Sequence, residues 1–167
     1  MVIGLMGVGK STLGRLLADA LSFDYVDSDD DINRLFGTSG GVLAERLDVP
    51  ALHRIESGVL LGALAREEPA VISAAASVVE DLAVREAVAN RADVVWLHAE
   101  LDEVLHRQGQ GDHRRPMARD ELAALAERRL PLFESMANVK VIADGDPSWL
   151  VELVLTNLPT VQPPKEE

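Results

Sequence analysis

Short apolar segments alternate along the chain with longer stretches whose apolar residues recur every three or four positions. The short segments have the length of buried strands, and the longer ones have the spacing of amphipathic helices. We predict five strands, at Met1–Leu5, Phe23–Asp27, Ala70–Ser73, Asp93–Leu97 and Val139–Ala143. We predict helices from Ser11 to Leu21 and at Leu52–Ala65, Val79–Ala89, Leu101–Arg107 and Arg119–Arg129.

This alternation predicts an α/β fold, a five-stranded parallel sheet with helices on both faces. A chain of 167 residues has the usual length of one domain, which we place at residues 1–158. The tail, Pro159–Glu167, holds three prolines and three charged residues, and we expect it to be disordered.

Composition narrows the class of protein. With 47% hydrophobic residues the chain can build a core, and the absence of cysteine excludes disulfides, thiolate chemistry and cysteine-ligated zinc. A net charge of −12 argues against nucleic acid and anionic membranes as partners. The chain has no membrane-length apolar run, and Lys10 and Ser11 interrupt the N-terminus before a signal peptide could form. We therefore expect a cytoplasmic protein, and a monomer.

The segment Gly4–Ser11 reads G-L-M-G-V-G-K-S and matches the phosphate-loop pattern G-x-x-x-x-G-K-[ST] at every fixed position. Glycines let successive backbone N–H groups converge on a phosphate, and the following helix adds its positive end. A chance glycine-rich turn is the alternative, but a strand precedes the motif and an amphipathic helix follows it. The predicted nucleotide-binding residues are Gly7, Val8, Gly9, Lys10, Ser11 and Thr12, with Lys10 reaching the β- and γ-phosphates and Ser11 holding Mg²⁺.

The phosphate loop alone does not name a reaction. Three further segments appear in order after it and after Gly14 and Arg15: Asp27-Ser28-Asp29, Arg115-Pro116-Met117, and Arg129 before Pro131-Leu132-Phe133. With this set, over roughly Met1–Leu155, the chain resembles the shikimate kinases. The resemblance implies a P-loop kinase of the nucleoside-monophosphate-kinase type with a mobile lid. It also implies ATP and Mg²⁺ as cofactors and phosphoryl transfer to a ring hydroxyl of a small substrate.

The same resemblance implies roles for two aspartates. Asp27 would help to hold Mg²⁺ through water, and Asp29 would accept the proton of the acceptor hydroxyl or position that hydroxyl. Because the two residues alternate at a predicted strand end, their side chains should point in different directions. An acidic turn that caps the helix near Ile32 is the alternative, a role that Asp30 and Asp31 could serve equally well.

A polar, glycine-rich segment, Gln108–Pro116, separates two predicted helices and reads as a flexible loop that could close over phosphates. Arg115 occupies the family's lid position and is predicted to be catalytic, together with Lys10 and Asp29; an exposed, solvated loop is the alternative. Arg107 lies where the family places an arginine against adenine, with a spacing one residue longer. Pro147 lies in the adenine-binding region, although Asp146-Pro147 could equally start a helix.

The acceptor half departs from the family pattern. The family segment F-R-x-x-E, whose arginine grips the substrate carboxylate, reads Leu52–Glu56 here, with His53 at the arginine position. Histidine cannot make arginine's planar two-bond contact, and the adjacent Arg54 lies ~100° around the helix. His53 could also be an ordinary, partly buried helical histidine. Ala75, Ala76 and Ser77 stand where the family has three glycines facing the substrate, so we expect the backbone there to differ in shape from the family's.

Arg129, the family's second carboxylate-binding arginine, is kept, or it could pair with Glu127 or Glu134 on its own helix. The predicted substrate-binding residues are thus Asp29, His53, Ala75, Ala76, Ser77 and Arg129. Shikimate is the best named acceptor, and another polyol or a gluconate-like sugar acid is the alternative. A third hypothesis, a nucleotide-binding module without acceptor chemistry, has no use for Asp29 and Arg115.

Overall fold

A computed structural model of the chain describes residues 1–109 and 117–158. Its five strands form one parallel sheet in the order β2-β3-β1-β4-β5. The strands are β1 (Val2–Ile3), β2 (Asp24–Asp27), β3 (Ala70–Ser73), β4 (Val95–His98) and β5 (Val139–Ile142). The predicted fold class is therefore confirmed. The expected disordered tail lies outside the described residues.

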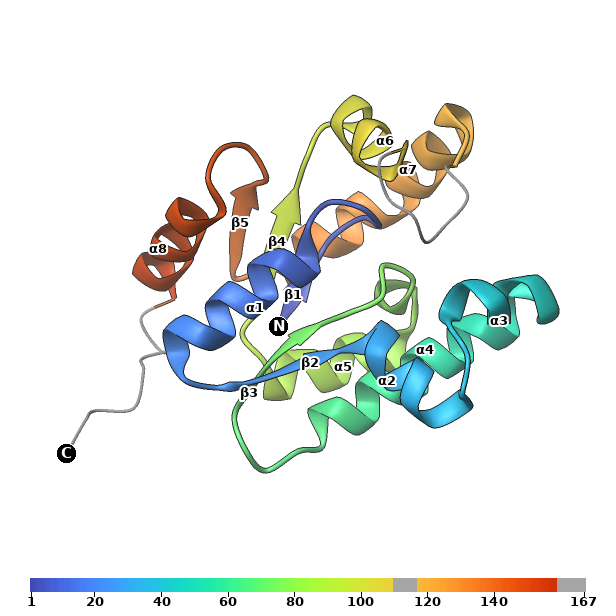
Figure 1. The fold of residues 1–167 in the computed structure, drawn as a ribbon, viewed down its shortest axis with the longest axis horizontal. Coiled ribbons are helices and arrows are strands. Elements are labelled where there is room, and N and C mark those ends of the chain that lie inside the picture. The colour runs from blue at the N-terminus through green and yellow to red at the C-terminus, as the bar shows by residue number, and fades with distance from the viewer. Residues whose placement is uncertain (110–116, 159–167) are drawn as a thin grey trace.

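Helix α1 passes in front of the sheet beside α8, and α5 and α7 lie behind it (Figure 1). The helices are α1 (Lys10–Leu21), α2 (Ser28–Phe36), α3 (Gly40–Arg46), α4 (Val49–Leu64), α5 (Leu82–Arg91), α6 (Leu101–Gly109), α7 (Arg119–Met136) and α8 (Pro147–Asn157), with a 3-10 turn, η1, at Val78–Glu80. None of the helices within the described ranges is long and apolar enough to cross a bilayer.

Among the differences from the sequence prediction, two helix boundaries have a clear local reason. Helix α5 begins at Leu82 rather than Val79 because the Asp81 side chain caps it, accepting hydrogen bonds from the backbone N–H groups of Ala83 and Val84. Helix α7 runs past Pro131 to Met136, where we predicted an end at Arg129. Proline removes one helical hydrogen bond, but Phe133 in the next turn is completely buried, and its packing offsets that loss. Helix α3, of seven residues, was not predicted.

All the strands run in one direction, so their carboxyl ends meet at one edge of the sheet. The phosphate loop leaves β1 there, and Asp27 and Ser73, the last residues of β2 and β3, are paired neighbours. The Ser73 hydroxyl donates to the Lys10 carbonyl oxygen at 3.1 Å, which ties β3 to the start of α1. This edge therefore places Asp27 and Ser73 beside the phosphate loop and the start of α1.

Gly14 allows α1 to approach β2 and β3 closely. A Cβ atom at this position would lie 2.5 Å from Ser73 Oγ and 2.7 Å from Tyr25 Cε2. We therefore expect Gly14→Ala to lower the free energy of unfolding by about 1–3 kcal/mol, measured by chemical denaturation.

Gly62→Ala, in α4, is the matched control because a Cβ there meets no described atom within 4 Å. It should raise stability by about 0.5–1 kcal/mol through the higher helix propensity of alanine. Equal destabilisation by both variants would contradict the close approach at Gly14.

Candidate active site

The phosphate loop has the geometry that its glycines predict. Gly4 and Gly9 adopt φ angles of 149° and 106°, and a Cβ on Gly4 would lie 2.3 Å from the Leu97 carbonyl oxygen. A residue with a side chain is strained at such φ angles, so the motif needs glycine at both positions. Lys10 Nζ donates to the carbonyl oxygens of Gly4, at 3.2 Å, and Leu5, at 3.1 Å. The ammonium group thus lies against the loop that would hold the phosphates.

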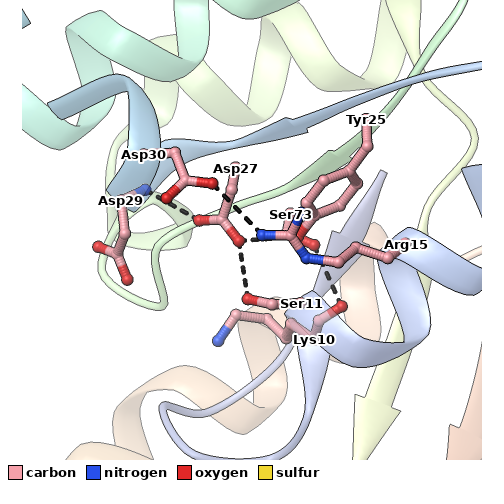
Figure 2. Close-up of polar contacts among 8 residues, drawn as sticks. All are labelled: Lys10, Ser11, Arg15, Tyr25, Asp27, Asp29, Asp30 and Ser73. Carbon is pink, nitrogen blue, oxygen red and sulfur yellow. Dashed lines mark hydrogen bonds and ion pairs between the residues drawn. The ribbon is translucent and has the colours of Figure 1, made fainter. Parts of the chain in front are cut away.

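Asp27 joins the phosphate loop to the predicted acceptor side (Figure 2). Its Oδ2 atom accepts a hydrogen bond of 2.7 Å from Ser11 Oγ, and its Oδ1 atom accepts one of 3.0 Å from the backbone N–H of Asp29. The second bond makes Asp27 the N-cap of α2. Asp27 is therefore a helix cap and also the carboxylate beside Ser11, and its role toward Mg²⁺ stays a prediction.

The neighbouring aspartates have separate positions. Asp30 pairs with Arg15 at 3.4 Å and Asp31 with Arg34 at 2.9 Å, so neither provides the cap expected of them. Asp29 lies in the first turn of α2, not on the strand, and its exposed carboxylate points away from the Ser11 contact (Figure 2). The side chains of Asp27 and Asp29 do diverge, because a strand ends between them and a helix begins.

Tyr25 was missed by the sequence analysis. Its hydroxyl donates to Asp27 Oδ2 at 2.7 Å, and the Arg15 guanidinium lies 4.5 Å from the centre of its ring (Figure 2). Burial, with the Asp27 carboxylate beside it, raises the pKa of Tyr25 to about 12, so the hydroxyl remains a donor at neutral pH. Strand alternation could have revealed this contact, since residues 25 and 27 share one face of β2.

The predicted adenine region is a cavity of about 270 Å³, lined by residues that include Val8, Gly9, Thr12, Arg107 and Pro147. Arg107 donates to the carbonyl oxygens of Val8, at 2.8 Å, and Ala143, at 2.6 Å. Pro147 lines this cavity and is also the first residue of α8, with Asp146 as its cap. The helix start predicted for this dipeptide is confirmed, and the adenine-binding role of Pro147 stays a prediction.

The acceptor-side residues occupy the segment after β3 and the helices around it. His53 is half-buried in α4, and Ala76 and Ser77 are buried, with Ala75 partly exposed. Ser77 Oγ donates to the carboxylate of Glu56, a buried residue of α4. The segment's backbone is held from another side, where Arg85 Nη1 donates to the Val79 carbonyl oxygen at 2.7 Å.

Arg129 does not pair along its own helix. It is buried, and its Nε donates to Glu80 Oε1 at 2.6 Å, so the partner is a residue of η1 rather than Glu127 or Glu134. The alternative of a surface pair was wrong because α7 turns this face toward η1, which removes Arg129 from solvent.

Comparison with known proteins is decisive for the family. The shikimate kinase family model matches residues 6–159. The chain belongs to the shikimate kinase family. A shikimate kinase of Shewanella frigidimarina is 33% identical over 155 residues, which cover 90% of each chain. Members are ATP-dependent small-molecule kinases, so this chain is a shikimate-kinase-like phosphotransferase.

Solved structures agree with this assignment. Shikimate kinase from Acinetobacter baumannii in complex with shikimate superposes with a TM-score of 0.87 at 25% identity, over 95% of this chain and 91% of that one. A gluconokinase from Sinorhizobium meliloti matches with a TM-score of 0.63 at 19% identity, over 95% of this chain and 90% of that one, which shows a shared fold.

The predicted nucleotide-binding residues all lie within the described part of the chain. Arg115 lies in residues 110–116, outside that part. The sequence analysis also missed Gln108, whose side-chain amide donates to the Met6 carbonyl oxygen at 3.1 Å, and Glu56 and Glu80. Glu56 is the glutamate of the F-R-x-x-E pattern, and this was the sequence signal that could have found it. No sequence pattern pointed to Glu80.

Proposed function

We propose that this shikimate kinase family member uses Mg·ATP to phosphorylate a hydroxyl of a small metabolite, with Lys10, Asp29 and Arg115 as catalytic residues. One observation carries the proposal. A continuous chain of contacts runs from the phosphate loop through Ser11 and Asp27, 2.7 Å apart, to the backbone of Asp29, 3.0 Å from Asp27. This chain sets the distance between the donor phosphates and the group that would meet the acceptor, as in-line transfer requires.

The donor set beside the phosphate loop fits magnesium. Ser11 Oγ and Asp27 Oδ2 are hard oxygen ligands 2.7 Å apart, and Mg²⁺ commonly binds through one or two protein oxygens, phosphates and waters. When bound, the ion neutralises charge on the β- and γ-phosphates. Ser11 would bind it directly and Asp27 through water.

The transfer has a simple balance of bonds. The acceptor hydroxyl oxygen forms a bond to the γ-phosphorus as the bond from that phosphorus to the β–γ bridging oxygen breaks. Asp29 takes the hydroxyl proton or orients the hydroxyl, while Lys10 and Arg115 stabilise the charge on the phosphoryl oxygens. The products are ADP and a phosphate monoester.

Shikimate is the reference acceptor, since the chain's relatives are shikimate kinases and the Acinetobacter enzyme is seen with shikimate. A polyol or gluconate-like sugar acid is the second candidate, favoured by the altered residues His53, Ala75, Ala76 and Ser77. ADP release over a panel of hydroxylated metabolites tests the proposal. ATP turnover that no acceptor stimulates would favour a nucleotide-binding module instead.

We propose that the protein works in the cytoplasm, as a monomer, on a small molecule rather than on nucleic acid or a membrane.

Tyr25 should act as a positioning residue for Asp27. Tyr25→Phe removes one hydrogen bond to the carboxylate but keeps the ring under Arg15. We expect the Mg²⁺ concentration for half-maximal turnover to rise about threefold to tenfold, with stability nearly unchanged. Tyr25→Leu, which also removes the ring, should lower stability as well. An unaltered Mg²⁺ dependence in Tyr25→Phe would contradict this role.

A further inference from the structure

The segment after β3 forms one wall of the acceptor side of the site. Ser73, at the end of β3, accepts a hydrogen bond of 3.1 Å from Ser28 Oγ through its carbonyl oxygen. The segment that follows, residues 74–80, therefore starts beside the first turn of α2 (Figure 1). It then packs between α4 and α7 through η1. An acceptor whose hydroxyl meets Asp29 would have this segment as a wall.

Arg129, the predicted carboxylate-binding arginine of this wall, is already paired with a carboxylate of the protein. The Arg129 side chain is 4% exposed and its Nε lies 2.6 Å from Glu80 Oε1, while the Glu80 side chain is 31% exposed. A charge-assisted contact of this length is a strong one, and low local polarity strengthens it further. A ligand carboxylate at Arg129 would have to displace Glu80 or lie against it, and like charges at contact distance repel.

Apart from Arg85, the other groups of the wall are carboxylates and a histidine. Glu56 is buried and accepts the hydrogen bond of Ser77 Oγ, so its carboxylate faces the same segment. His53 lies one helical turn before Glu56 in α4 and lacks the permanent positive charge of an arginine. Arg85 contributes a contact to the Val79 carbonyl, which holds η1 in place and with it Glu80. Asp29 contributes a further carboxylate at the edge of the site.

We propose, on the basis of the phosphotransferase function above, that the acceptor is a polyol or cyclic alcohol with no carboxylate at the end facing Arg129, and that Glu80 is the residue that sets this preference. Uncharged hydroxyl and carbonyl oxygens can accept hydrogen bonds in this pocket without electrostatic repulsion from the Glu80 carboxylate. The substrate class is therefore neutral hydroxylated compounds, and shikimate serves as a weakly held reference.

The test compares shikimate with its methyl ester, which has the same ring and hydroxyls but no charge. Binding is measured by calorimetry in the presence of Mg²⁺ and a non-hydrolysable ATP analogue. The wild-type protein should bind the ester at least as tightly as shikimate. Binding of shikimate tenfold tighter than the ester would overturn the proposal, and this comparison needs no variant.

Glu80→Gln then assigns the preference to a residue. It should tighten shikimate binding about tenfold and leave the ester within twofold, and Glu80→Gln with Arg129→Gln should return shikimate to the wild-type level. Glu86→Gln, an exposed glutamate on α5, is the matched control and should change neither ligand. An unchanged ratio in Glu80→Gln, or no binding of either ligand to any of these proteins, would also overturn the proposal. Thermal melts check that each variant is folded.

Turnover separates this proposal from the proposed function. If the binding preference holds but no acceptor stimulates ADP release, the phosphotransferase function is wrong and the preference for an uncharged acceptor stands. If shikimate is turned over with a lower KM than the ester, the kinase function stands and that preference is wrong.

Discussion

Lys10→Ala should reduce acceptor-dependent kcat/KM by about 10²–10³-fold. The ammonium group lies at the mouth of the phosphate loop, 3.2 Å from the Gly4 carbonyl oxygen and 3.1 Å from that of Leu5. From there it can reach the γ-phosphate, where charge moves during transfer, and removing one such donor typically has an effect of this size. Steady-state ADP release measures the loss.

The fold should survive this change, since Lys10 is not one of the buried core side chains and its described hydrogen bonds go to carbonyl oxygens of the loop. A loss of about 1 kcal/mol in the free energy of unfolding is the most we expect. Lys140→Ala is the matched control, because Lys140 lies on β5 with its Nζ 4.2 Å from the centre of the Trp96 ring. It removes a lysine at a distance from the phosphate loop and should leave turnover intact. Wild-type turnover in Lys10→Ala would refute the phosphate-loop assignment.

The second large effect is expected at the acceptor pocket. Shikimate should be a poor substrate, because His53 cannot make the charged two-bond contact of an arginine. Losing such a contact costs about 1.5–3 kcal/mol, or roughly tenfold to a hundredfold in affinity. The side chains of Ala75, Ala76 and Ser77 add a steric penalty of about 1–3 kcal/mol.

Restoring arginine at 53 together with glycine at 75, 76 and 77 should therefore lower the KM for shikimate more than either change alone. The structure adds a reason: because Arg129 is already paired to Glu80, a guanidinium at position 53 would add a positive charge on the acceptor side. Glycine at 77 would also remove the hydrogen bond to Glu56. The KM for ATP should be unchanged, which serves as the internal control.

A tight KM for shikimate in the natural protein would show that this interpretation of the pocket is wrong. The three glycines also loosen the backbone, by about 0.5–1 kcal/mol each where the native φ suits alanine. Melting temperatures should accordingly be recorded with the kinetics, so that a loss of folded protein is not mistaken for a loss of binding.

The phosphate loop could be predicted from sequence because its geometry is local. The segment Gly4–Ser11 fixes its own conformation through glycines that no other residue can replace, and a strand and a helix frame it. Asp27 follows from the same logic, since parallel strands end at one edge of the sheet. Even the missed contact of Tyr25 with Asp27 spans two residues on one strand face.

The acceptor half could not be predicted in this way, because its contacts join distant parts of the chain. Glu80 and Arg129 lie 49 positions apart, and Glu56 and Ser77 lie 21 apart. No periodicity or motif in the sequence predicts that Arg129 pairs with Glu80. That pairing depends on how η1 packs between α4 and α7. The sequence by itself determined that this chain binds a nucleotide and transfers phosphate. Only the tertiary structure decided which charges on the acceptor side are matched within the protein, because burial makes an unmatched charge so costly that packing must pair it.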